Sequence, residues 1–450
     1  MKRILILLSC AAALLLGACG KDSSLPSATG KASVRAINAI KTSQEFNFLI
    51  EQRLISSVAY TSVSSPARYD DLDYTFNIEV FYPGETGFRR IASRFIDFEA
   101  NKDYTLLVSG SLASPTLTLW EDDERAFDAA DTVFEAKFAH TAESLGALDY
   151  YFADPTIVPA LGSQAATLSF GEISPPVDFE AGDFVLTITT AGNPGDVVFV
   201  SDTSALSAQA TYIITPFDGD AGDTAPVLVR AINTSGNSLA LPDSRFPPTI
   251  EFVNASLGLG ASDIYDDEML TSRIVTNLDY PEVSTEMELP VDAVTFYFTP
   301  TGDTTAVTLE RSLAAFGGGR YRIIATGPAG NIFAVATAPN RRSVETQAKL
   351  LVFQGSSNFD FIDFYAVAAG TSIDDANPTR FALATRQVSE PLRLAAGSYD
   401  LYATEFAEKV PLAGPYQIDV ALGDVVDMII VDTEDPSVLD VLFLSGGPTP

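Results

Sequence analysis

Few residues in this 450-residue sequence could carry nucleophilic or metal chemistry. Cys10 and Cys19 are the two cysteines, and His140 is the one histidine. Because both cysteines precede Gly20, the rest of the chain has no disulfide, thiol nucleophile or thiolate metal site. A single histidine nearly excludes Ser-His-Asp catalysis and zinc sites that use several imidazoles.

Acidic side chains are the other source of chemistry, since 59 Asp and Glu residues accompany only 27 Lys and Arg. Calcium needs roughly six to eight oxygens converging from loops. No acidic cluster has EF-hand spacing and none recurs at each domain junction, so we interpret the clusters as solvated loops, with weak calcium binding as the alternative. The clusters are Asp70-Asp71-Leu72-Asp73, Asp218-Gly219-Asp220 with Asp223, Asp263 with Asp266-Asp267-Glu268, and Asp374-Asp375.

Pairs of carboxylates could also serve a glycosidase, in which one acts as the acid and the other as nucleophile or base. Nothing in the sequence singles out one pair from the others. We therefore expect no enzymatic activity, no cofactor and no metal, and a carboxylate-based hydrolase is the least favoured alternative.

The run Phe316-Gly317-Gly318-Gly319-Arg320 superficially resembles a phosphate-binding loop. Such a loop needs Gly-Lys-Ser/Thr at the start of a helix, whereas here a strand-like segment begins directly at Tyr321. We interpret the run as a tight turn. Tyr321 and its counterparts Tyr104 and Tyr212 are expected to hydrogen-bond back to the preceding loop, like the tyrosine corner of immunoglobulin folds.

Two sequence patterns with fixed spacing, which we call frames, each occur four times along the chain without gaps. In the first frame a hydrophobic residue and a serine precede a strand that starts ten positions after the serine: Val63-Ser64 then Tyr74, Ile173-Ser174 then Phe184, Val283-Ser284 then Val294, and Val388-Ser389 then Tyr399. The second frame joins polar residues nine positions apart: Asn38 and Asn47, His140 and Asp149, Asn254 and Asp263, Gln354 and Asp363. Since His140 takes the place of Asn or Gln, we interpret it as a structural capping group.

The strand after the first frame alternates apolar and polar residues, most clearly over 74–80. A pleated strand buries every second side chain, so Tyr74, Phe76, Ile78 and Val80 are expected on one buried face. The first repeat has seven short strand signals with turn residues between them, which is typical of an antiparallel sandwich. The sequence therefore predicts an all-β chain of four tandem antiparallel β-sandwich domains.

The predicted domains are 32–131, 132–245, 246–346 and 347–445, followed by a tail over 446–450. The junctions are brief and polar, and 122–130 is the only stretch that could form a short helical linker. Short linkers between sandwiches favour an extended rod.

The N-terminus has the pattern of a secretory signal. Met1-Lys2-Arg3 precedes an apolar run from Ile4 to Leu16 that is too short to span a bilayer comfortably. Leu16-Gly17-Ala18-Cys19 resembles a bacterial lipobox, which implies a signal peptide over 1–18, cleavage before Cys19, and lipidation of that cysteine. Residues 19–31 would form the lipidated cysteine and a flexible stalk. Gly20, in place of aspartate, favours the outer membrane, with its periplasmic or cell-surface side left open.

The repeats resemble the bacterial domain of unknown function numbered 4397, found in exported and surface proteins. The matching segments are Val34-Arg35-Ala36-Ile37-Asn38-Ala39, Tyr60-Thr61-Ser62-Val63-Ser64, Ile362-Asp363-Phe364-Tyr365 and Leu394-Ala395-Ala396-Gly397-Ser398-Tyr399. The third repeat departs most, with Val291-Asp292-Ala293 where a glycine turn is expected. The resemblance implies an immunoglobulin-like sandwich and export, and it carries no catalytic residues.

Charge limits the partners. Loss of Lys2 and Arg3 with the signal changes the formal charge from −32 to −34 (−32 − 2), which argues against nucleic acid and anionic lipid as partners. We expect a monomer that contacts the membrane through its lipid and acts as a spacer, adhesion or interaction module for a protein or glycan. The alternative is a carbohydrate- or polymer-binding protein that uses outward aromatic residues such as Tyr297 and Tyr402.

Overall fold

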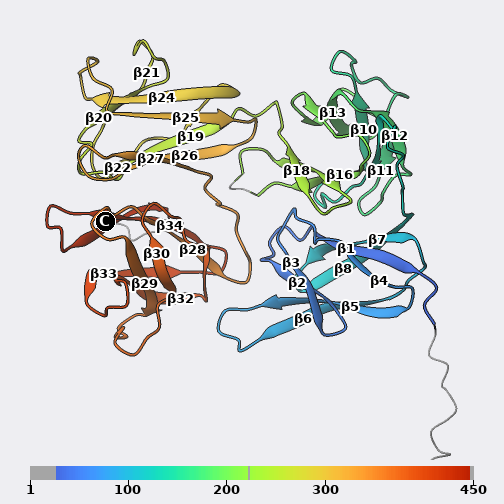
Figure 1. Ribbon diagram of the computed structural model, residues 1–450, viewed down its shortest axis with the longest axis horizontal. Coiled ribbons are helices and arrows are strands. Elements are labelled where there is room, and N and C mark those ends of the chain that lie inside the picture. Colours follow the sequence, from blue (N-terminus) through green and yellow to red (C-terminus); the bar gives the residue numbers. More distant parts are fainter. Residues whose placement is uncertain (1–26, 221–222, 446–450) are drawn as a thin grey trace, which may run out of the picture.

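The computed structural model describes residues 27–220 and 223–445, and within these ranges the regular elements are all β-strands. They form eight sheets, which stack two by two into four sandwiches (Figure 1). This confirms the predicted all-β tandem-sandwich fold. The predicted boundaries 131/132, 245/246 and 346/347 each fall between the last strand of one sandwich and the first strand of the next.

In each of the first two sandwiches the chain passes back and forth between an inner sheet, which faces the neighbouring sandwich, and an outer sheet. The first sandwich contains β1 (Lys31–Asn38), β2 (Phe46–Ile50), β3 (Arg53–Val58), β4 (Ala67–Asp70), β5 (Asp73–Phe81), β6 (Phe88–Asp97), β7 (Lys102–Ser111) and β8 (Ser114–Asp123). The second contains β9 (Val133–Phe138), β10 (Leu148–Ala153), β11 (Ala166–Leu168), β12 (Val177–Glu180), β13 (Asp183–Thr190), β14 (Val197–Val200), β15 (Ser204–Ala205), β16 (Thr211–Asp218), β17 (Val227–Asn233) and β18 (Ser238–Leu241).

The other two sandwiches repeat this order. The third contains β19 (Thr249–Asn254), β20 (Ser262–Tyr265), β21 (Arg273–Leu278), β22 (Glu282–Val283), β23 (Met287–Glu288), β24 (Asp292–Pro300), β25 (Leu309–Ala315), β26 (Arg320–Thr326) and β27 (Phe333–Thr337). The fourth contains β28 (Ala348–Gln354), β29 (Phe361–Ala368), β30 (Arg380–Ala384), β31 (Leu392–Leu394), β32 (Gly397–Glu405), β33 (Pro411–Val420), β34 (Val425–Asp432) and β35 (Leu439–Ser445).

All four sandwiches share one topology. The inner sheets have the orders β4-β1-β7-β8, β12-β9-β16-β17-β18, β22-β19-β26-β27 and β31-β28-β34-β35. In each of them the first strand of the domain pairs in parallel with a later one, as β1 does with β7. The outer sheets, such as β3-β2-β5-β6, are antiparallel.

The core of each sandwich lies between its two sheets. In the first sandwich Phe76, Ile78 and Val80 of β5 are fully buried against Phe46 and Phe48 of β2. The predicted alternation of β5 is therefore correct, and Tyr74 at its start is half-buried. The sequence signals missed β4, a short edge strand that pairs only with β1.

The inner sheets are buried on both faces because the sandwiches associate in pairs. Every residue of β16 and of β28 is buried. The inner sheets of the first and second sandwiches contact each other through one apolar cluster, and those of the third and fourth do the same. The first cluster includes Ile37, Leu107 and Trp120 from one sandwich and Ile213, Phe217 and Ile232 from the other.

The two pairs lie side by side, so the predicted extended rod is wrong. The fourth sandwich returns to the first, and the third faces the second, which gives a closed two-by-two array (Figure 1). Pairing within each half has a physical reason, since a row of separate sandwiches would leave the apolar face of every inner sheet in water. The two pairs are joined instead by polar contacts, such as that of Thr224 with the carbonyl of Gly318. A helix over 122–130 is not formed either, because β8 continues to Asp123 and no helix follows it.

Candidate functional site

The serine of the first frame is structural in all four sandwiches. Its hydroxyl accepts a hydrogen bond from a backbone N–H of the first strand of its domain. The distances are 2.9 Å for Ser64 to Ala36, 2.9 Å for Ser174 to Phe138, 2.9 Å for Ser284 to Phe252, and 3.1 Å for Ser389 to Val352. The serine therefore holds its segment against the inner sheet and is not available as a nucleophile.

The first residue of the second frame hydrogen-bonds a backbone carbonyl, as predicted for His140. The His140 ring is fully buried, and its Nε2 lies 2.8 Å from the carbonyl oxygen of Gly146. Burial lowers the pKa of His140, and the hydrogen bond to Gly146 opposes that shift only partly. Asn254 similarly donates to the carbonyl of Gly260 at 2.8 Å.

The acidic residue of the second frame accepts backbone hydrogen bonds from two segments of the outer sheet. The buried carboxylate of Asp263 accepts hydrogen bonds from the backbone N–H of Asn277 at 2.9 Å and of Gly302 at 3.1 Å. Arg273 adds an ion pair at 3.0 Å. Burial alone would raise the pKa of Asp263, but these hydrogen bonds and the ion pair outweigh it and lower that pKa. Asp363 accepts from Ala382 and Ala407 in the same way.

The predicted tyrosine corner is confirmed. The hydroxyl oxygens of three tyrosines accept a backbone N–H from five residues upstream. These bonds join Tyr104 to Glu99 at 3.1 Å, Tyr212 to Ser207 at 3.3 Å and Tyr321 to Phe316 at 3.1 Å.

The glycine run is a tight turn, as predicted, and it lies where the third sandwich approaches the second. Gly318 has a φ of 68°, and its N–H donates to the carbonyl of Phe246 at 2.7 Å. A Cβ on Gly317 would lie 2.6 Å from the carbonyl oxygen of Asp243. Close approach of two backbones, and not phosphate binding, therefore explains why glycine is needed here.

The acidic clusters cap turns. Asp71 accepts hydrogen bonds from the N–H groups of Thr29 and Gly30, and Asp267 accepts from Thr271 and Ser272. Within residues 27–220 and 223–445, no three His, Cys, Asp or Glu side chains gather in a way that could hold a metal ion.

The two tyrosines predicted for ligand binding do not share a surface. Tyr297 lies on β24 opposite Tyr265, and Tyr402 lies on β32 opposite Tyr365, in the outer sheets of different sandwiches. Both are half-buried. Cys19, the predicted lipidation site, lies outside the described residues, and the described part of the chain contains no helix long and apolar enough to cross a membrane.

The linker between the third and fourth sandwiches forms a polar hub that the sequence did not reveal. Its Arg342 donates to the carbonyl oxygens of Lys41 and Ser43 in the first sandwich, both at 2.7 Å, and lies 5.2 Å from the ring centre of Tyr60. The N–H of Ser343 donates to Asp220 of the second sandwich at 2.7 Å. One linker thus contacts both members of the other pair.

The hub is partly buried: Arg342 is half-buried and the neighbouring Lys349 is buried. Burial lowers the pKa of Arg342, and burial followed by the nearby charge of Arg342 lowers the pKa of Lys349 to about 8. Tyr60 in turn donates its hydroxyl to the carbonyl of Asp218 at 2.6 Å, and Tyr280 makes the equivalent bond to Asp432 in the other pair. The two pairs are therefore built alike.

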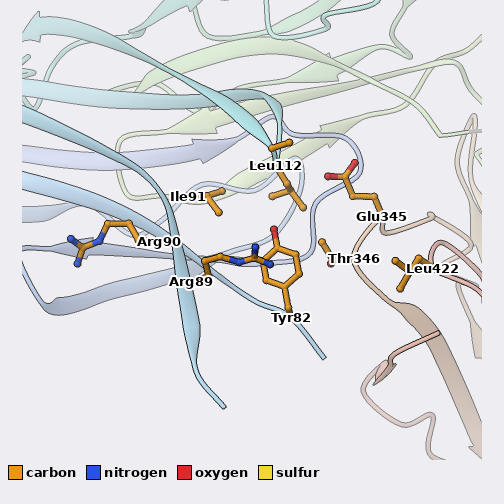
Figure 2. Close-up of a pocket in the computed structure, with 9 residues that line it drawn as sticks. Tyr82, Arg89, Arg90, Ile91, Leu112, Glu345, Thr346 and Leu422 are labelled. Atoms are coloured by element: carbon orange, nitrogen blue, oxygen red, sulfur yellow. The ribbon is translucent and has the colours of Figure 1, made fainter. Parts of the chain in front are cut away.

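A first cavity, of about 650 Å³, opens between the first and fourth sandwiches. Figure 2 shows Arg89 lying over the ring of Tyr82, with Glu345, Thr346 and Leu422 on the opposite side. The Arg89 guanidinium carbon is 3.6 Å from the ring centre of Tyr82. Thr346 is 8% exposed, and its hydroxyl has no hydrogen-bond partner among the described residues.

A second cavity, of about 780 Å³, opens between the second and third sandwiches. It lies along β17 and β18 of one sandwich and the glycine turn of the other. Its lining is mainly apolar and includes the carboxylate residue Asp202. Both volumes fall in the range of roughly 300–1,000 Å³ that small-molecule sites occupy. Sequence reasoning missed both cavities because each is formed by two domains.

Fold and cavities together define the class: an all-β assembly of paired sandwiches with two cavities that open between domains. The family described as Domain of unknown function (DUF4397) matches residues 32–151 and 248–365, which is more than half of the chain. The chain belongs to this family. The two matches begin at the first and third sandwiches, in agreement with the repeated pairs.

Comparison with curated proteins gave no match. Among solved structures, the Bacillus anthracis TIE protein aligns with 90% of this chain and 69% of its own, at 10% identity and a TM-score of 0.16. A family CBM26 module from Eubacterium rectale Amy13K, solved with maltoheptaose, aligns with 46% of this chain and 98% of its own, at 14% identity and a TM-score of 0.17. Similarities this weak carry no argument about fold or ligand.

Proposed function

We propose that this chain is a non-catalytic lipoprotein of the cell envelope that acts as a monomeric interaction module. Cys19 would anchor it in the outer membrane, and the four sandwiches would present binding surfaces to a protein or glycan. The lipobox-like segment at Leu16–Cys19 supports the anchor. Several acyl chains hold a protein firmly, at about 0.8 kcal/mol per buried methylene.

The closed array carries the proposal for the soluble part. The inner sheets join the sandwiches into two stiff pairs, because separating the members of either pair would expose an apolar cluster. The linker 338–346 then holds one pair against the other. Both cavities are formed by residues from two sandwiches, so each exists only while the array is closed. Such a platform suits recognition, which depends on preformed concave surfaces.

The anchor is tested by replacing Cys19 with serine. We expect the Cys19→Ser protein to leave the membrane fraction and become soluble, because its acyl chains are lost. Wild-type cells treated with protease, intact and after outer-membrane permeabilisation, then report on which side the array lies. Membrane retention of the Cys19→Ser protein would contradict lipid anchoring.

A second candidate function is carbohydrate binding at the cavity between the first and fourth sandwiches. The stacked Tyr82 and Arg89 offer a flat surface with hydrogen-bond donors, and Glu345 opposite them offers acceptors. A flat surface that carries donors, with acceptors facing it across the cavity, suits a polyhydroxylated ligand. An anion is less well matched, because Arg89 already pairs with Glu85 at 3.1 Å.

Tyr82→Ala tests this second function. With maltohexaose, cellohexaose and chitohexaose as probes, we expect saturable binding of at least one sugar by the wild type and at least a tenfold loss in the variant. Isothermal titration measures both. Tyr297→Ala and Tyr402→Ala serve as matched controls that should keep wild-type affinity. No saturable binding of any probe by the wild type would reject a site for these sugars, and loss of binding only in the controls would place the site on the outer sheets.

A further inference from the structure

The cavity between the second and third sandwiches combines an apolar wall with one unpaired acid. Leu239 of the edge strand β18 is 48% exposed, and Phe316 before the glycine turn is 55% exposed. Both line the cavity, together with Leu241 and Tyr321. Such exposed apolar side chains around one hollow favour an apolar ligand group there.

Asp202 differs from the other charged residues of this cavity. Its carboxylate is half-buried and has no hydrogen-bond or ion-pair partner among the described residues, whereas Asp243 is engaged by Arg245 at 2.7 Å. Burial, and then the charge of Asp243, raise the pKa of Asp202. An acid in this setting is stabilised in its charged form by any cation that reaches it.

The cation that lines the cavity does not fill this role. Arg230 extends a guanidinium nitrogen to the hydroxyl of Thr61 in the first sandwich, at 3.5 Å, and its electrostatic partner is Asp223. Asp202 therefore remains without a cationic partner among the described residues, in a chain of net charge −32.

We propose that this cavity binds a small amphipathic cation, with the apolar body against Phe316 and Leu239 and the ammonium group at Asp202. The volume of about 780 Å³ suits a small molecule. This site does not depend on the proposed lipoprotein role or on carbohydrate binding at the other cavity.

The test compares two probes of similar shape, 2-phenylethylammonium and neutral 2-phenylethanol, on the mature chain by isothermal titration. We expect the cation to bind at least tenfold more tightly than the alcohol. Asp202→Asn should weaken the cation at least tenfold and leave the alcohol unchanged. Phe316→Ala should weaken both probes. Asp154→Asn, which changes an exposed acid on the same sandwich, should change neither.

The pH dependence has a defined sign. Wild-type affinity for the cation should fall as the pH decreases through the raised pKa of Asp202, since the probe remains charged while the carboxylate is neutralised. The Asp202→Asn protein should lack this fall. Equal affinity for cation and alcohol, an unchanged Asp202→Asn protein, or no binding of either probe would each overturn the proposal.

Discussion

Replacing Phe217 by alanine is expected to destabilise the first sandwich pair by about 3–5 kcal/mol, the usual cost of deleting a buried phenylalanine ring. Phe217 is fully buried between two sandwiches, and its ring meets that of Tyr60 edge-on at 5.9 Å. The change removes apolar contact from both inner sheets at once. It should therefore weaken the pairing of the sandwiches as well as the second sandwich itself.

The chain contains its own reporter for this experiment. Trp120 is the only tryptophan of the sequence; it is 5% exposed and lies in the same apolar cluster. Its indole N–H donates to the carbonyl of Gly171 in the second sandwich at 2.9 Å. Urea unfolding followed by Trp120 fluorescence should show a red shift at lower urea in Phe217→Ala. Phe95→Ala, which removes a 63% exposed ring, is the matched control, and equal midpoints for the two variants would refute the paired interface.

Replacing Arg342 by methionine is expected to weaken the contact between the two pairs by about 3 kcal/mol. Hydrogen bonds from a charged donor contribute about 1.5–3 kcal/mol each, and Arg342 makes two of them to the first sandwich. Methionine keeps much of the apolar stem, so the change removes mainly the guanidinium. The pairs should remain folded because their apolar clusters do not include Arg342.

Limited proteolysis separates these two effects. In Arg342→Met we expect faster cleavage in the linker 338–346, with the two pairs surviving as stable fragments. Arg311→Met, which changes an exposed arginine of β25, should be cleaved at the wild-type rate. Unfolding of the pairs together with linker cleavage would show that the hub supports the fold itself, contrary to our account.

The fold could be predicted from the sequence to the level of one domain. Two of its features have local physical causes, because each needs only one side chain and one neighbouring strand. They are the strict alternation over 74–80 and the recurring serine at Ser64, Ser174, Ser284 and Ser389. The tyrosine corner could be predicted for the same reason. The edge strand β4 gave no signal because it has only four residues and two of them are charged, although its Tyr69 packs on the core.

The arrangement of the domains could not be predicted by the same means. A signal did exist, since Thr211–Asp218 is almost continuously apolar or neutral, which is typical of a strand buried on both faces. The hub gave no signal in the sequence, because Arg342 and Ser343 occupy a polar stretch that is typical of a solvated linker. The cavities depend on that arrangement, so Tyr82 and Asp202 could not be recognised as candidate site residues. Tyr297 and Tyr402 were chosen only because the alternation of their strands places them on the outward face.

The closed array is tested most directly by small-angle X-ray scattering of the mature chain. A compact particle of this size has a radius of gyration of about 22–26 Å, which is the value we predict. Four sandwiches in a row would give a value above about 40 Å and an elongated distance distribution. That second result would contradict the array, and with it both cavities on which the proposed binding sites depend.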